Sequence, residues 1–87
     1  MKRILVSPKA VRVAAWLHHS ASPTQVISDV ALGSIVGLEA DTVLRALKEL
    51  SELGALTYTR AGDHDPRTIT VLPACWIWSA LAQGVAL

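Results

Sequence analysis

The sequence predicts a small α+β domain that is mainly helical, with three helices, a β-hairpin and a last helix. Two observations predict this fold class. Between Leu32 and Leu56, two helical segments are separated by a tight turn and closed by a glycine. After Gly54, helical periodicity gives way to the alternation of a hairpin. The 87 residues leave room for one core, so we take residues 1–87 as a single domain.

The first two helices are predicted from their start signals. Ser7-Pro8 places a favoured N-cap before a proline at the first helical position, and the helix is expected to run to about His18. The predicted inner residues are Val11, Ala14, Ala15 and Leu17, with Trp16 beside them. Ser22-Pro-Thr-Gln25 repeats the signal with a capping box, which predicts a second helix from Pro23 to about Val36.

The third helix follows a turn at Gly37, where a sharp corner needs a positive φ. Gly33, four residues earlier, leaves space for a close helix crossing, and Gly54 is placed as the residue that ends the third helix. The expected inward stripe is Val43, Leu47 and Leu50, flanked by Ala40, Leu44 and Leu53. The expected outer face carries Asp41, Thr42, Arg45, Lys48, Glu49 and Glu52.

The hairpin is predicted from two runs of β-branched and aromatic residues, at 56–59 and 68–72, with turn-forming residues between them. Its core-facing residues are expected to be Leu56, Tyr58, Ile69 and Val71. A nearly apolar last helix is expected over about 74–83. The segment Ile4-Leu-Val6 fits either a short strand on the hairpin sheet or part of a dimer contact.

The stretch from Gly33 onward resembles the winged helix-turn-helix of bacterial regulators of the MarR, Lrp and IclR kind, and related domains of plasmid replication initiators. The residues that carry the resemblance are Gly33, Gly37-Leu38, Thr42-Val43, Leu47, Leu50 and Gly54-Ala55-Leu56. It implies a helix-turn-helix at about 23–53 and a wing at about 55–72, followed by the C-terminal helix. The sequence departs from the family pattern at Glu39, where serine or threonine usually caps the reading helix.

The candidate DNA contacts lie on the third helix and the hairpin. Arg45 suits a bidentate contact to guanine, while Thr42, Lys48 and Ser34 suit phosphates. Arg60 and Arg67 flank the hairpin loop, where such domains reach the neighbouring groove. Lys2, Arg3, Lys9 and Arg12 could add a basic margin. The alternative is that these side chains simply face water, and that Asp63, His64 and Asp65 only form a solvated turn.

The last helix is the predicted dimer contact. Trp76 and Trp78 lie about 200° apart around a helix, so both cannot enter so small a core. We therefore expect one ring to face the core and the other a second copy, in a contact formed by Trp76 or Trp78 with Ile77, Leu81 and Val85. The alternative is packing within one chain against Trp16 and Leu17.

Composition limits the possible functions. A net charge of +1 excludes DNA binding by bulk charge, and the 52% apolar fraction suggests an oligomer interface. We expect no membrane span, cofactor, metal or small-molecule effector, and the single Cys75 fits the cytoplasm. Asp63-His64-Asp65 cannot converge on one ion, and no catalytic motif surrounds the serines or histidines, so no enzyme is predicted.

The expected function is sequence-specific binding of double-stranded DNA by a homodimeric transcriptional regulator of the repressor type. One alternative is a plasmid or phage partition or replication adaptor, which uses a similar domain. The other is a protein-interaction winged helix that does not bind DNA, favoured by the acids Glu39, Asp41, Glu49 and Glu52.

Overall fold

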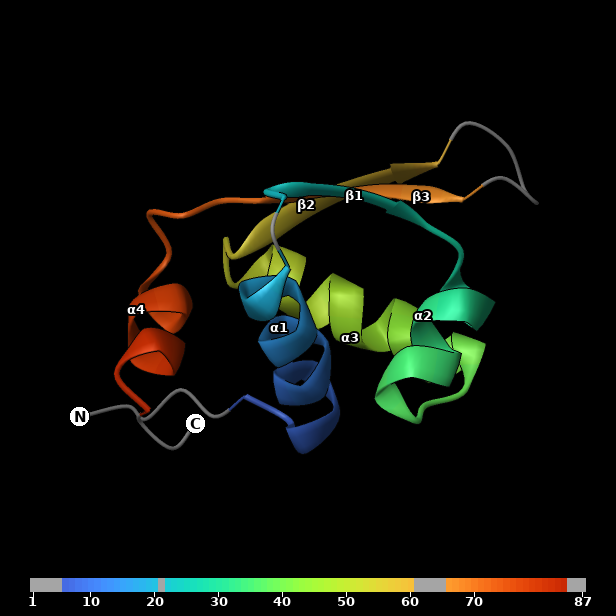
Figure 1. Cartoon of the computed structure of the whole chain (residues 1–87), viewed down its shortest axis with the longest axis horizontal. Coiled ribbons are helices and arrows are strands. Elements are labelled where there is room, and N and C mark those ends of the chain that lie inside the picture. The colour runs from blue at the N-terminus through green and yellow to red at the C-terminus, as the bar shows by residue number, and fades with distance from the viewer. Residues whose placement is uncertain (1–5, 21, 61–65, 85–87) are drawn as a thin grey trace.

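Three helices lie against one face of a three-stranded antiparallel sheet, and a fourth helix lies beside these two layers (Figure 1). The computed structural model describes residues 6–20, 22–60 and 66–84. The elements are, in order, α1 (Pro8–His19), β1 (Thr24–Ile27), α2 (Asp29–Val36), α3 (Ala40–Glu52), β2 (Leu56–Arg60), β3 (Arg67–Val71) and α4 (Trp76–Ala82). The predicted class, α+β and mainly helical, is confirmed.

Helix α1 begins where the sequence predicts. The Ser7 side chain accepts a hydrogen bond from the Ala10 N–H at 3.2 Å, and Pro8 occupies the first turn. The buried face differs from the predicted one, because it is formed by Ala10, Val13, Ala14 and Leu17. This is the i, i+3, i+4, i+7 spacing of a single helical stripe. Val11 and Ala15 lie at its margins and are half-buried.

The prediction that the second helix starts at Pro23 is wrong, because this segment forms β1. The helix starts at Asp29, where Ser28 provides the N-cap and accepts a hydrogen bond from the Ala31 N–H at 3.1 Å. The β-branched pair Val26-Ile27 suits an extended strand, and β1 gains a full antiparallel ladder with β3. This tertiary pairing outweighs the local capping signal.

The turn between α2 and α3 uses both predicted glycines. Gly37 ends α2 with φ 76°, in the left-handed region that favours glycine. Gly33 packs so close to the turn that a Cβ there would collide with the carbonyl oxygen of Leu38. The same Cβ position lies 3.5 Å from Val43 Cγ2, so α3 also approaches α2 closely at this point.

Helix α3 carries the predicted apolar stripe. Val43, Leu47 and Leu50 are fully buried, and Gly54 follows the helix with φ 79°. Glu39 is the N-cap and makes no side-chain capping bond, as its departure from serine or threonine implies. Helix α3 packs against α1, α2 and β2, so it contacts both of the other helices on this face of the sheet.

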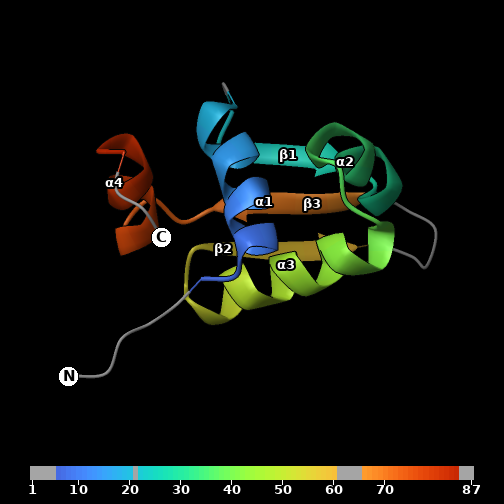
Figure 2. The ribbon, with the colours of Figure 1, turned by 90° about the horizontal axis from the view of Figure 1, so that it is seen from below.

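The sheet has the strand order β1-β3-β2, with both pairs antiparallel. Leu56 and Ile69 are buried and Tyr58 and Val71 are half-buried, which confirms the predicted inward side of the hairpin. The opposite face of the three strands carries Thr24, Val26, Thr57, Thr59, Thr68 and Thr70. Helices α1, α2 and α3 all lie on the same side of this sheet (Figure 2).

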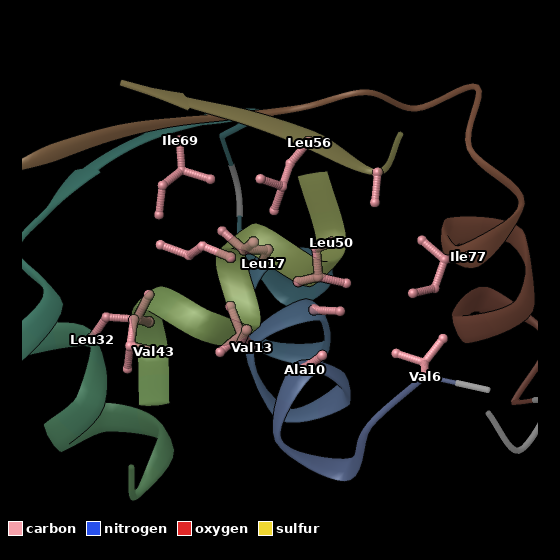
Figure 3. Close-up of a cluster of buried hydrophobic side chains, with 14 of the residues drawn as sticks. Val6, Ala10, Val13, Leu17, Leu32, Val43, Leu50, Leu56, Ile69 and Ile77 are labelled. Atoms are coloured by element: carbon pink, nitrogen blue, oxygen red, sulfur yellow. The ribbon is translucent and has the colours of Figure 1, made fainter. Parts of the chain in front are cut away.

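The core lies between the helices and the sheet, and it extends toward α4 (Figure 3). Val6 is buried, and Figure 3 shows it near Ile77 of α4. Of the apolar segment at the start of the chain, Ile4 and Leu5 lie outside the described residues. Val6 itself is in no strand, and the third strand of the sheet is β1.

The close approach at Gly33 leads to a stability prediction. Replacing Gly33 by alanine should lower the free energy of unfolding by about 1 to 3 kcal/mol, because the obstacle is a backbone carbonyl that moves only with the α2–α3 turn. Urea denaturation measures this change. The control is Ser34→Ala on the exposed side of α2, expected to change stability by less than about 0.5 kcal/mol. Equal stability of Gly33→Ala and the parent chain would contradict the assigned contact.

Candidate nucleic-acid interface

The outer face of α3 is the first component of the candidate site. Arg45 and Lys48 are exposed, together with the acids Asp41 and Glu52, and Thr42 is half-buried at one side. These charged side chains lie on a helix whose opposite face is buried in the core. Their positions along the surface are therefore set by the packing of Val43, Leu47 and Leu50.

The start of α1 brings a further cation to α3. Lys9 and Arg45 line a hollow of about 220 Å³ between the two helices, whose other lining residues are Ser7, Thr42, Ala46 and Glu49. Hydroxyl and cationic groups in one concavity are suited to a phosphate oxygen. The sequence predicted Lys9 only as part of a loose basic margin.

Arg12 extends this surface toward the α2–α3 turn. Its Nη1 atom lies 3.8 Å from the position that a Cβ would take at Gly37. The residues Lys9, Arg12, Arg45 and Lys48, here called the α1–α3 cation group, are all exposed and lie on two adjacent helices. Lys9 and Arg45, which are distant in the sequence, thus line the same hollow.

Glu49 does not add an exposed acid to this surface. Its Oε2 accepts a hydrogen bond from the Ser7 N–H at 2.8 Å, and the side chain is half-buried. Glu49 therefore holds the start of α1 against α3 and keeps Lys9 close to Arg45. The sequence placed Glu49 on the open outer face, because the position of α1 cannot be read from α3 alone.

Arg67, predicted to contact DNA from the hairpin, is instead a structural residue. It is 6% exposed, and its Nε donates a hydrogen bond of 2.7 Å to Asp29 Oδ1 in an ion pair. Its guanidinium carbon also lies 5.3 Å from the centre of the Tyr58 ring, within cation–π range. The predicted role is wrong because Arg67 lies on the core-facing side of β3, with Ile69.

The other hairpin and α2 candidates contribute less. Arg60 is the last residue of β2 and pairs in register with Arg67, but its side chain lies outside the described part of the chain. Asp63, His64 and Asp65 lie outside it altogether. Ser34 is exposed on α2, where the other exposed residues, Val30, Ala31 and Ile35, are uncharged.

The predicted dimer residues on α4 separate into two groups. Trp78 is buried and its Nε1 donates a hydrogen bond of 3.0 Å to the Ala55 carbonyl, and Ile77 is fully buried. These two side chains belong to the core of their own chain and do not supply the predicted contact. Trp76 is 43% exposed and Leu81 is half-buried, while Val85 lies outside the described residues.

A second hollow, of about 270 Å³, lies between the end of α1, the two strands β1 and β3, and α4. It is lined by Leu17, His18, Ser20, Ser22, Pro23, Val71, Pro73 and Trp78. No signal in the sequence indicates this hollow, because its walls come from four segments that meet only in the fold. Its lining contains no lysine, arginine or acid.

Among residues 6–20, 22–60 and 66–84, no group of three or more histidine, cysteine, aspartate or glutamate side chains is arranged to hold a metal ion. Within the same ranges, each helix is too short or too polar to cross a membrane. Comparisons with protein-family models, with curated proteins and with solved structures found no match.

The buried Arg67–Asp29 pair leads to a prediction about stability. Asp29→Ala should lower the free energy of unfolding by about 3 kcal/mol, because it leaves the Arg67 charge buried without its partner. Arg67→Met should cost less, since it removes the buried charge and keeps apolar volume. Urea denaturation of both variants and of the double variant gives the coupling energy. A change below about 0.5 kcal/mol for Asp29→Ala would contradict a structural role for the pair.

Proposed function

We propose that the chain is a winged helix-turn-helix protein that binds double-stranded DNA. In support, the elements follow the order helix, strand, two helices joined at Gly37, and a β-hairpin. The hairpin strand β2 packs directly beside α3. In this proposal α3 enters the major groove, and Arg45 is directed at a base edge.

The observation that carries the proposal is the α1–α3 cation group. With a net charge of only +1, the chain has no general attraction for DNA, so any affinity must come from cations gathered on one surface. Four of its eight lysines and arginines are exposed on the two packed helices α1 and α3, and Lys9 and Arg45 line one hollow between them. About four to six phosphate contacts per protomer are the most that this charge supports, and binding should weaken steeply with salt.

We propose that the protein acts as a homodimer and regulates transcription by occupying its site, as a repressor does. The apolar fraction of 52% in so small a chain favours an oligomer. A partition or replication adaptor would use the same surface. A footprint distinguishes them, because one or two half-sites fit a repressor and a long array fits an adaptor.

A protein-interaction domain is the second candidate, and one observation favours it. Glu39, Asp41 and Glu52 are exposed at or near the outer face of α3, beside Arg45 and Lys48. This mixture of charges would suit a partner protein with its own mixed charges. The involvement of Glu49 in the Ser7 hydrogen bond weakens this candidate, because it removes one of the four acids from the free surface.

Charge variants on α3 test the proposal. Arg45→Ala should lower the affinity for the specific site by about 1 to 3 kcal/mol and relax the specificity at the contacted base pair. Glu52→Ala, on the same exposed face, should have the opposite effect and strengthen binding to random duplex, because it removes a negative charge. Fluorescence anisotropy across a salt series measures both, after selection of bound genomic fragments has identified the site.

The control is His19→Ala, an exposed change at the far end of α1 that should leave DNA binding unaltered. Binding that is insensitive to both Arg45→Ala and Glu52→Ala would place the contact elsewhere on the chain. Absence of any binding to random or genomic duplex at about 50 mM salt would favour the protein-interaction candidate instead.

A further inference from the structure

We propose that β1 is the dimerisation strand of this protein. In this arrangement two copies pair their β1 edges antiparallel about a two-fold axis at Val26, and the uncharged outer faces of α2 pack beside the contact. The inference assigns a surface to the proposed homodimer, and it does not depend on DNA binding.

The backbone of β1 has one free edge. The strand lies at the margin of the sheet, with only β3 beside it. The Val71 N–H donates to the Pro23 carbonyl at 2.9 Å, in the same register that pairs Gln25 with Ile69. Because hydrogen-bonded pairs alternate in an antiparallel ladder, the backbone groups of Thr24 and Val26 point away from β3.

Ser22 occupies one of these two outward positions. Its Oγ accepts a hydrogen bond from the Thr24 N–H at 3.3 Å and donates one to the Thr24 carbonyl at 2.8 Å. Val26 is therefore the β1 residue whose outward N–H and carbonyl have no partner among the described residues. Val26 paired with Val26 of a second copy would exchange two N–H···O=C bonds across a two-fold axis.

The exposed residues of β1 and of α2 are uncharged, with Val26 on the face of the sheet that points away from the helices. Val30, Val26 and Ile35 are 69%, 67% and 55% exposed, the highest values among the exposed large apolar residues of the described chain. The other exposed residues of α2 are Ala31 and Ser34. In Figure 2, α2 and β1 lie on one flank of the molecule, and α3 and β2 lie on the opposite flank.

A second copy is the occupant that this surface fits best. A phosphate backbone or a charged peptide would gain no ion pair there, because neither β1 nor the exposed residues of α2 carry a charge. A second copy has the same uncharged residues, so no charge opposes the contact. It also offers the same outward N–H and carbonyl of Val26, which can pair with those of the first copy. Edge strands that must stay unpaired usually carry lysine, proline or a bulge. Pro23 lies just before β1, but the strand Thr-Gln-Val-Ile itself contains no lysine or proline.

The geometry of the pairing sets the shape and strength of the dimer. Two antiparallel edge strands related by a two-fold axis form one continuous sheet, here of six strands, with the axis perpendicular to the sheet. Both α2 helices then lie on the same face of that sheet and meet near the axis. Three exposed apolar side chains and one backbone pair supply less than the roughly 800 Å² per partner of a standard interface, so we expect micromolar affinity.

Sedimentation equilibrium of the full chain tests the pairing, with variants that add a charge at the edge of β1. Val26→Lys should raise the dimer dissociation constant at least about tenfold, because two like charges would meet at the axis. Its side chain is exposed, so the thermal midpoint of the monomer, measured well below the dimer dissociation constant, should not change. The matched control is Thr57→Lys, which adds the same charge to the same face of the sheet at β2 and should leave dimerisation unaltered.

A second variant and a second measurement separate this interface from one on α4. Trp76→Glu should leave the dissociation constant unchanged, and the exchange of the Val26 amide hydrogen should slow as protein concentration rises. A dimer weakened by Trp76→Glu but not by Val26→Lys would overturn the proposal, as would a chain that is monomeric at about 100 μM. DNA binding measured on the same variants is a separate readout, so loss of the pairing is not confused with loss of the proposed function.

Discussion

The ion pair between Arg67 and Asp29 is the interaction on which the arrangement of this chain depends. It joins the middle strand of the sheet to the first turn of α2, so it holds the start of the second helix, just after the end of β1, against β3. A guanidinium buried to this degree is tolerated only with a partner, and here a carboxylate and an aromatic ring both supply one. The same interaction removes Arg67 from the outer surface, so the basic face is formed by helices and not by β3.

Local signals were sufficient to predict the helices whose ends are set by their own residues. Ser7-Pro8 begins α1, and the apolar stripe with Gly37 and Gly54 delimits α3. They failed at β1, because the residues of its ladder partner β3 lie forty or more positions further along the chain. The sequence predicts Ser22 as a helix cap, whereas in the fold its hydroxyl bonds to the outward N–H and carbonyl of Thr24 at the edge of β1. The β-branched pair Val26-Ile27 was the signal available in the sequence, and two residues are too few to show an alternation.

The part of the candidate site on α3 could be predicted from the sequence, but the part on α1 could not. Arg45 and Lys48 follow from the amphipathic pattern of α3, whereas Lys9 and Arg12 join them only because α1 crosses α3. That crossing depends on Glu49, which the pattern alone assigns to solvent. On α4, helical geometry correctly predicts that Trp76 and Trp78 face different sides. It does not show which of the two rings is buried in the core.

The two flanks of the molecule differ in the kind of partner they can hold. The α1–α3 flank concentrates cations that a nearly neutral chain would otherwise disperse, and the β1–α2 flank carries no exposed charge. An unpaired strand edge beside exposed valines is a general aggregation hazard, since each added copy can offer a new edge. Ser22 limits that hazard because it occupies the outward groups of Thr24 and leaves a single residue to pair. A contact restricted to one residue and its symmetry mate is closed by its own two-fold axis, which favours a dimer over an open chain of copies.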